Sequence, residues 1–185
     1  MKKTMLALLA SVALPMGAFA LDAEAVKKQV VADVAAKIAT PEIIAAIKAQ
    51  NAAHAGLDDA GIKAKDDAWR AETQAAAKPM IDAVLANATS TALKAVKDGS
   101  AGMYTEIFIM DNKGLNVGQS DVTSDYWQGD EDKFSKSFGA GADGVFMDEV
   151  EFDESAQVFN TQVSVAIKDE TGAAIGAVTV GVAAE

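Results

Sequence analysis

The sequence predicts an α+β fold in which Ala-rich N-terminal helices pack on a five-stranded antiparallel sheet. Up to about residue 98, apolar residues recur every three to four positions, the spacing of one helix face. From Tyr104 onward the apolar period changes to two, the period of a strand with one buried face. Short turns rich in Asp and Gly separate the later apolar runs. Helices followed by hairpin-connected strands are typical of the α+β class.

The helical half, residues 21–98, divides at local start and stop signals. The first helix carries one apolar stripe with a four-residue spacing: Val26, Val30, Val34 and Ile38. Thr40-Pro41-Glu42 predicts the start of a second helix, because it places a capping hydroxyl, a first-turn Pro and an acid in order. Asp58 can cap a third helix, and Lys78-Pro79 precedes a fourth over residues 80–97.

The strands of the second half are separated by short connections. The first begins at Tyr104, and the others are expected over residues 115–119, 144–152, 158–167 and 174–182. Two of the connections, Asp111–Gly114 and Asp169–Gly172, have the composition of tight turns. One helix, over residues 130–138, is expected as an excursion after the second strand.

The N-terminus has the layout of a secretory signal peptide. Lys2 and Lys3 precede a short apolar run, and Ala18-Phe19-Ala20 fits a cleavage site, so we expect residues 1–20 to be removed. Residues 21–100 would form the helical segment and residues 101–185 the sheet domain, together one structural unit. The chain has no Cys, which excludes disulfides and thiolate metal sites. We therefore expect a periplasmic protein that is secreted through a cleaved signal peptide.

The charge balance excludes some partners. The full chain has a formal net charge of −11, and removal of the two leader lysines makes it more acidic. Such a chain repels nucleic acid and anionic membrane surfaces. The composition is compatible with cationic ligands, although a solvated acidic surface explains it equally well.

The most informative stretch is the run from Ser124 to Asp132, called here the aromatic loop. It places Tyr126 and Trp127 side by side among acids, outside any periodic apolar element. Adjacent aromatics in a polar loop are well suited to line a small-molecule pocket. Alternatively, one aromatic pins the loop onto the sheet. Asp130 could accept a hydrogen bond from a ligand amine or could cap the following helix.

The second half resembles the Cache domains, which are extracytoplasmic PAS-like sensor modules also called PDC domains. The similarity is carried by Asp111-x-x-Gly114, the aromatic loop, Asp169-x-x-Gly172 and Ile175-Gly176, and is closest over residues 103–183. It implies a ligand site under the aromatic loop. In family members that bind amino acids, an aromatic residue and an Asp on a strand hold the amino group, and Phe146 and Asp148 are the matching pair here.

Other candidate residues carry weaker signals. Lys133 could hold a ligand carboxylate, although exposed lysines usually do nothing. Arg70 could bind an anion, or it could snorkel beside Trp69 on the helical bundle. His54, the only histidine, lies near an expected helix end, where a dipole-compatible role is the simpler explanation.

These features predict a stand-alone, non-enzymatic sensor without a cofactor. It would bind a small polar metabolite of the amino acid, amine or short carboxylate class, and a membrane-bound kinase, cyclase or chemoreceptor would read its helix, alone or in a homodimer. One alternative is a helical adaptor without a small ligand. Another is a divalent-metal binder that uses acids of the aromatic loop: Asp125, Asp130, Glu131 and Asp132. Catalytic motifs of the G-x-S-x-G type are absent from the sequence.

Overall fold

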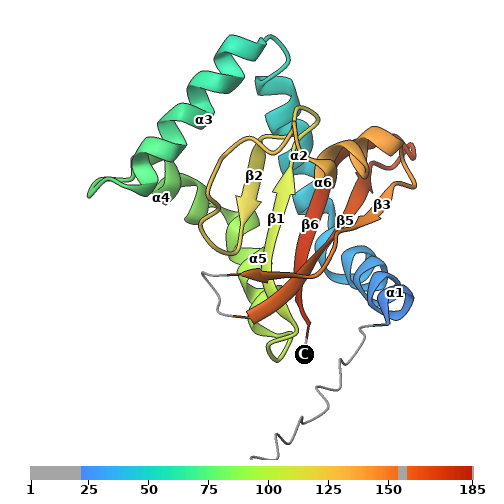
Figure 1. The fold of residues 1–185 in the computed structure, drawn as a ribbon. Coiled ribbons are helices and arrows are strands. Elements are labelled where there is room, and N and C mark those ends of the chain that lie inside the picture. The colour runs from blue at the N-terminus through green and yellow to red at the C-terminus, as the bar shows by residue number, and fades with distance from the viewer. Residues whose placement is uncertain (1–21, 154–157, 185) are drawn as a thin grey trace, which may run out of the picture.

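The computed structural model describes residues 22–153 and 158–184, and it confirms the α+β class (Figure 1). The predicted signal peptide lies outside these residues. The sheet runs in the order β2-β1-β6-β5-β3, β4 also pairs with β5, and every pair is antiparallel. The strands are β1 (Tyr104–Met110), β2 (Asn116–Gln119), β3 (Val145–Met147), β4 (Glu151–Asp153), β5 (Val158–Lys168) and β6 (Ala174–Ala183).

Side-chain caps confirm the helix starts predicted at Thr40 and Asp58, and a further cap lies at Asp22. Asp22, Thr40 and Asp58 each accept a hydrogen bond from a backbone N–H in the first turn of the helix that follows. The helices are α1 (Ala23–Asp33), continued by a π-helical turn over Val34–Ile38, then α2 (Pro41–Ala53), α3 (Asp59–Thr73), α4 (Pro79–Leu85), α5 (Ala88–Asp98) and α6 (Asp132–Ser135). Within the described ranges, no helix combines the length and apolarity needed to cross a membrane.

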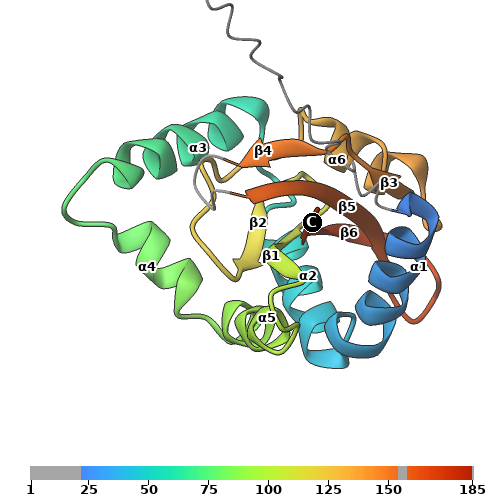
Figure 2. The same cartoon turned by 60° about the horizontal axis from the view of Figure 1, so that its bottom comes forward.

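The helices are distributed unequally over the two sheet faces. Figure 2 shows α1, α2 and α5 on one face and α6 on the other, with α3 and α4 beyond the β2 edge. Ile107 and Ile109 of β1 point into the main core with residues of α1, α2 and α5. Phe108 and Met110, which alternate with them, pack with Phe134 of α6 on the opposite face. Alternate side chains of β1 therefore point to opposite faces of the sheet, and each set packs in an apolar cluster.

Two predicted elements are each divided in the structure. The helix expected over residues 80–97 is two helices, because Asn87 caps α5 by accepting a hydrogen bond from the Ser90 N–H at 2.7 Å. The strand expected over residues 144–152 is β3 and β4. Met147 pairs with Val163, and Glu151 pairs with Asn160. The β3–β4 segment therefore advances four residues where β5 advances three. This extra residue is a bulge, which interrupts the pairing.

The helix expected over residues 130–138 is also shorter than predicted. It consists of the single turn of α6, followed by a 3₁₀ turn over Phe138–Ala140. Ser137, which separates them, is fully buried and donates its hydroxyl to the Lys133 carbonyl. A Ser that bonds back to the preceding turn competes with continued helix.

Asp111 joins the helical layer to the β1–β2 turn. Its carboxylate is fully buried and accepts hydrogen bonds from the N–H groups of Lys113 and Leu115 within the turn. The same carboxylate lies 3.0 Å from Gln50 Nε2 and 2.7 Å from His54 Nδ1, both on the last turns of α2. His54 is thus a C-cap residue, as expected, and it also has a carboxylate partner that the sequence did not reveal.

We expect Asp111→Ala to lower the free energy of unfolding by at least about 2 kcal/mol, because it leaves several buried donors without an acceptor. Asp169→Ala is the matched control, since Asp169 opens the other Asp-x-x-Gly turn and its hydrogen bonds there lie at the surface, whereas those of Asp111 are buried. The control should cost about 1 kcal/mol or less. Urea denaturation measures both changes. Equal losses in the two variants would contradict a special role for Asp111.

Candidate ligand-binding site

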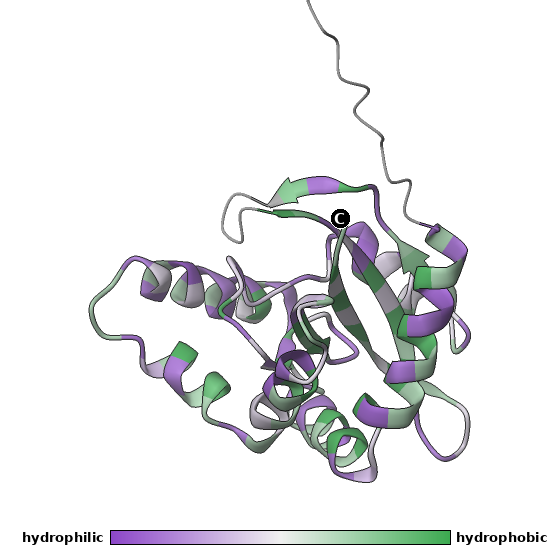
Figure 3. Ribbon diagram, turned by 90° about the horizontal axis from the view of Figure 1, so that it is seen from below, coloured by the Kyte–Doolittle hydropathy of each residue, from purple (hydrophilic) through white to green (hydrophobic). Residues whose placement is uncertain are grey.

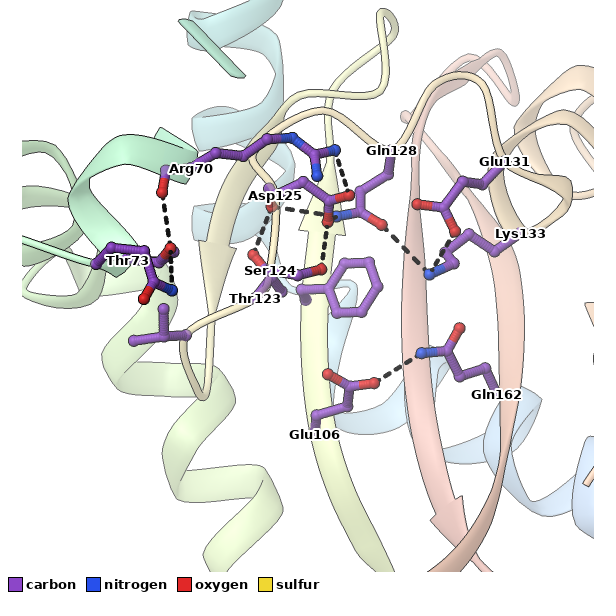
Figure 4. A pocket seen from close by; sticks show the side chains of 13 residues that line it. Arg70, Thr73, Glu106, Thr123, Ser124, Asp125, Gln128, Glu131, Lys133 and Gln162 are labelled. Atoms are coloured by element: carbon purple, nitrogen blue, oxygen red, sulfur yellow. Dashed lines mark hydrogen bonds and ion pairs between the residues drawn. The ribbon is translucent and has the colours of Figure 1, made fainter. Parts of the chain in front are cut away.

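A cavity of about 690 Å³ lies on the sheet face opposite the main helical layer (Figure 4). Its floor consists of Glu106 and Phe108 from β1 and Gln162 from β5. One wall is the C-terminal part of α3, and the other is formed by the aromatic loop and the start of α6. The wall residues are Arg70, Thr73, Gln74, Val122, Thr123, Ser124, Asp125, Gln128, Glu131 and Lys133.

Gly181 on β6 allows the two polar floor residues to meet. It pairs with Glu106 on one side and with Gln162 on the other. Gln162 Nε2 donates to Glu106 Oε1 at 2.7 Å across this glycine. A Cβ on residue 181 would lie 2.4 Å from Thr105 Oγ1 and 2.8 Å from Glu106 Cγ, so a side chain here would displace the floor. The floor of the cavity is therefore polar, and its depth depends on the absence of a side chain at Gly181.

Asp66 of α3 fixes the aromatic loop. Its Oδ1 accepts hydrogen bonds from the backbone N–H groups of Tyr126 and Trp127, at 2.9 and 3.0 Å. Its Oδ2 accepts from Arg70 Nε at 2.6 Å, and Arg70 Nη2 donates to Asp125 at 2.8 Å. One carboxylate and one guanidinium on adjacent turns of α3 thus hold both the backbone and an acid of the loop.

The environment keeps Asp66 ionised. Burial opposes ionisation, but the hydrogen bonds from Arg70 and from the N–H groups of Trp127 and Tyr126 outweigh it and hold the pKa of Asp66 below its usual range. The pKa of Arg70 is raised, because its hydrogen bond to Asp66 and the charge of Asp125 favour the charged guanidinium. The connection between α3 and the loop is therefore a charge-assisted one.

Tyr126 and Trp127 do not line this cavity. Tyr126 is 5% exposed, and its ring stacks on Trp69 with 5.4 Å between the ring centroids. Burial, with a smaller contribution from the charge of Asp111, raises the pKa of Tyr126 to about 12. Trp127 packs against the same cluster and donates its indole N–H to the Lys113 carbonyl at 2.8 Å. Both aromatics pin the loop, which was the alternative to ligand stacking.

Arg70 and Lys133 do line the cavity, from opposite walls (Figure 4). The side chain of Lys133 is largely buried, forms an ion pair with Glu131 and donates a hydrogen bond to Gln128. Its ammonium nitrogen lies 5.5 Å from the centroid of the Phe108 ring. A guanidinium has five N–H donors and an ammonium three, and each side chain uses two here. Donors therefore remain on both cations for an anionic group in the cavity.

Three other predicted residues lie elsewhere. Asp130 is exposed and is neither a cavity residue nor the cap of α6, whose N-cap position is Glu131. The ammonium nitrogen of Lys136 lies 4.8 Å from the centroid of the Phe146 ring. Asp148 is exposed in a separate hollow beside Ala23 and Lys27. Phe146 pairs with Ser164, on the same sheet face as Gln162, but neither Phe146 nor Asp148 lines the cavity, so the structure does not bring the proposed Phe–Asp pair to it.

Sequence reasoning missed the cavity floor and the residue that fixes its wall. Glu106 and Gln162 occupy the alternate positions to the apolar residues of two predicted strands, a pattern that indicates a second sheet face but no cavity. Asp66 and Arg70 are four residues apart on one helix, a spacing compatible with an ion pair. The contact of this pair with residues about sixty positions away had no local signal.

The acids of the aromatic loop do not gather around a common point. Asp125 faces Arg70, Glu131 faces Lys133 and Asp132 faces Lys136. In the part of the chain that the structure describes, no three His, Asp or Glu side chains are placed to hold a metal ion. The arrangement favours charge pairing over metal ligation.

No protein-family model and no curated protein matches the chain. Among solved structures, the chain is similar to the sensory domain of the Campylobacter jejuni chemoreceptor Tlp3, with 11% identity and a TM-score of 0.42, over 85% of this chain and 63% of that one. The extracellular domain of the putative histidine kinase rpHK1S-Z16 shows 15% identity and a TM-score of 0.43, over 86% and 58%.

A third similar structure is the ligand-binding domain of the Pseudomonas aeruginosa amino acid chemoreceptor PctC in complex with GABA. It shows 11% identity and a TM-score of 0.42, over 56% of this chain and 48% of that one. The chain spans less than two thirds of the length of each of the three structures. All three are sensory, ligand-binding or extracellular domains, but TM-scores below 0.5 assign neither a family nor a ligand to this chain.

We expect the lowered pKa of Asp66 to appear in the acid stability of the protein. The carboxylate has a lower pKa folded than unfolded, so its contribution is present above the unfolded value, about 3.9, and is lost as the pH falls through the folded value. Asp66→Asn should therefore be less stable than the wild type at neutral pH and lose less stability below about pH 4.

Asp67→Asn is the matched control, since Asp67 is the next residue of α3 and forms an exposed pair with Lys63. Urea denaturation from pH 7 to pH 2.5 measures the difference. If Asp66→Asn and Asp67→Asn follow the same curve, the linkage of the Asp66 carboxylate to the loop is wrong.

Proposed function

We propose that this chain is an exported, non-enzymatic ligand-binding sensor that signals to a separate membrane partner. The observation that carries the proposal is the cavity between the sheet face and the aromatic loop. It is concave, has a polar floor, and has side chains of both charges on its walls. Sites for small polar molecules combine such a cavity with a few placed polar groups. The Cache-like pattern of the second half supports the same function.

The charges favour a ligand that carries both signs. Arg70 and Lys133 offer donors to a carboxylate, while Glu106, Asp125 and Glu131 offer acceptors to an amine. Among amino acids, amines and short carboxylates, a molecule with both groups satisfies the most partners. Phe108 on the floor provides an apolar surface for a side chain of the ligand. An amino acid is therefore the leading candidate within the proposed class.

The signal would pass through the sheet. Alternate residues of β1 and β5 face the cavity on one side and the helical layer on the other. Tyr104 of β1 donates its hydroxyl to Asp33 of α1, and burial together with this hydrogen bond raises the pKa of Tyr104. Ligand binding would order the aromatic loop, and a shift of β1 would move α1. A membrane-bound kinase, cyclase or chemoreceptor would then read α1.

A thermal-shift screen of amino acids, amines, short carboxylates and purines tests the proposal. A ligand at about 100 times its Kd should stabilise the protein by about 2.7 kcal/mol. Isothermal titration then gives the stoichiometry, which should be one ligand per chain. If no compound of these classes shifts the transition, the proposed sensor function is wrong.

We expect Lys133→Met to weaken binding of the ligand found in the screen by about 10-fold or more, because it removes a charged donor worth about 1.5–3 kcal/mol. The Met side chain keeps most of the apolar stem. Lys136→Met is the matched control, since Lys136 lies on the following turn and pairs with Asp132 outside the cavity. Titration calorimetry compares them. Equal affinities would place the ligand away from Lys133.

A further inference from the structure

A cluster of exposed apolar side chains lies at the end of the sheet where α1 begins and β6 ends. Phe152 of β4 is 47% exposed and Phe159 of β5 is 55% exposed. The two are cross-strand partners, and their rings meet edge to face at 5.2 Å. Val150 and Met103 are 47% and 46% exposed. Exposed large apolar residues that gather in one region mark an interaction surface.

A groove of about 720 Å³ adjoins this aromatic pair. It is lined by the first turns of α1, the segment 100–103 and the end of β6: Ala25, Val26, Gln29, Val30, Ser100, Ala101, Gly102, Met103, Val182 and Ala183. Backbone bonds connect the parts, because Ala183 N–H donates to Met103 and Ala184 N–H donates to Phe159. Figure 3 shows this end of the molecule, where β5 lies between β4 and the end of β6. The groove and the aromatic pair form one surface, called here the terminal surface.

The terminal surface lies on the sheet face opposite the ligand cavity. Phe159 is four residues from Val163, which belongs to the main core with α1, so both side chains point to the helical side. Gln162, on the alternate side, belongs to the cavity floor. The two sites therefore share strand β5 but no side chain.

Charge selects the occupant of the terminal surface. Exposed acids lie at the start of α1 and in the segment just before β4: Asp22, Glu24 and Glu149. Lys27 and Lys28 are the nearby bases on α1, and Lys27 pairs with Glu24. Because the whole chain carries a net charge of −11, a second copy would bring like charges together, and an anionic bilayer would be repelled. A cationic partner with an apolar face fits both features.

We propose that the terminal surface docks a cationic amphipathic helix of the signalling partner. Apolar side chains spaced three and four residues apart would fill the groove, and Lys or Arg residues on the flanks would meet the acids. Phe152 and Phe159 would be the central aromatic contacts, as is usual for the residues that dominate binding. The proposal rests on the proposed function only for the identity of the partner, since the surface itself is defined by this chain.

Two synthetic peptides provide the test. One is an 18-residue helix of Leu and Lys with Leu at positions i, i+3, i+4 and i+7, and the other replaces every Lys with Glu. Fluorescence anisotropy at about 0.15 M salt should show binding of the Leu/Lys peptide to the full chain and none of the Leu/Glu peptide. The double variant Phe152→Ser/Phe159→Ser should weaken the Leu/Lys peptide by at least about 10-fold. Since both side chains are exposed, this variant should keep the wild-type urea midpoint.

Val145→Ser is the control for loss of an exposed apolar residue. Val145 pairs with Val165, six residues and about 20 Å along β5 from Phe159, and is 39% exposed. It should leave peptide affinity unchanged. If the wild type and the double variant bind the Leu/Lys peptide with equal affinity, the binding is general charge attraction and the proposal is overturned. A wild-type dimer in sedimentation that the double variant abolishes would overturn it too, by making a second copy the occupant.

The ligand screen separates this proposal from the proposed function. The double variant should retain any thermal shift that a metabolite produces in the wild type, because the cavity is on the other face. Peptide binding without any metabolite shift would contradict the sensor function and leave the terminal surface intact. A metabolite shift without peptide binding would contradict the terminal surface alone.

Discussion

The arrangement of the candidate site depends on the carboxylate of Asp66. A loop that crosses a sheet face has backbone N–H groups to satisfy, and a helix beyond the sheet edge needs a contact that fixes its position. Asp66 meets both needs, because it accepts two loop N–H groups and the Arg70 guanidinium. Trp69, one turn from Asp66, then stacks on Tyr126 and excludes water from the bonds. The Asp66 bonds, the aromatic stack and the bond from the Trp69 indole N–H to the Thr123 carbonyl together hold α3 and the aromatic loop around the cavity.

The alternation of side chains gives the sheet two different faces. On one face, a missing side chain at Gly181 leaves room for the Glu106–Gln162 floor. On the other, Ile107 and its neighbours hold α1, α2 and α5 in a continuous core. A ligand on the first face and a partner on the second would contact the same strands without competing for surface. Coupling between them requires only that β1 and β5 have two positions with different affinities.

Local chemistry explains which predictions from the sequence are confirmed. The caps at Thr40 and Asp58 and the turns at Asp111 and Asp169 involve bonds within a few residues, so the order of residue types is sufficient to indicate them. The Asn87 cap is local as well, but the helical apolar period continues across it and masks the break between α4 and α5. The bulge between β3 and β4 depends on the pairing with β5, which no local pattern contains.

The sequence alone determined the α+β class and most element starts. It also indicated Arg70 and Lys133 as cavity candidates, and the structure places both on the walls. Only the tertiary structure decided that Tyr126 turns inward onto Trp69 and that Glu106 and Gln162 form the floor. The physical reason is that the direction of a loop side chain depends on the free energy of contacts distant in sequence. Here the buried stack on Trp69 and the hydrogen bonds to Asp66 turn Tyr126 inward, although an aromatic pair in a polar loop by itself indicates a pocket lining.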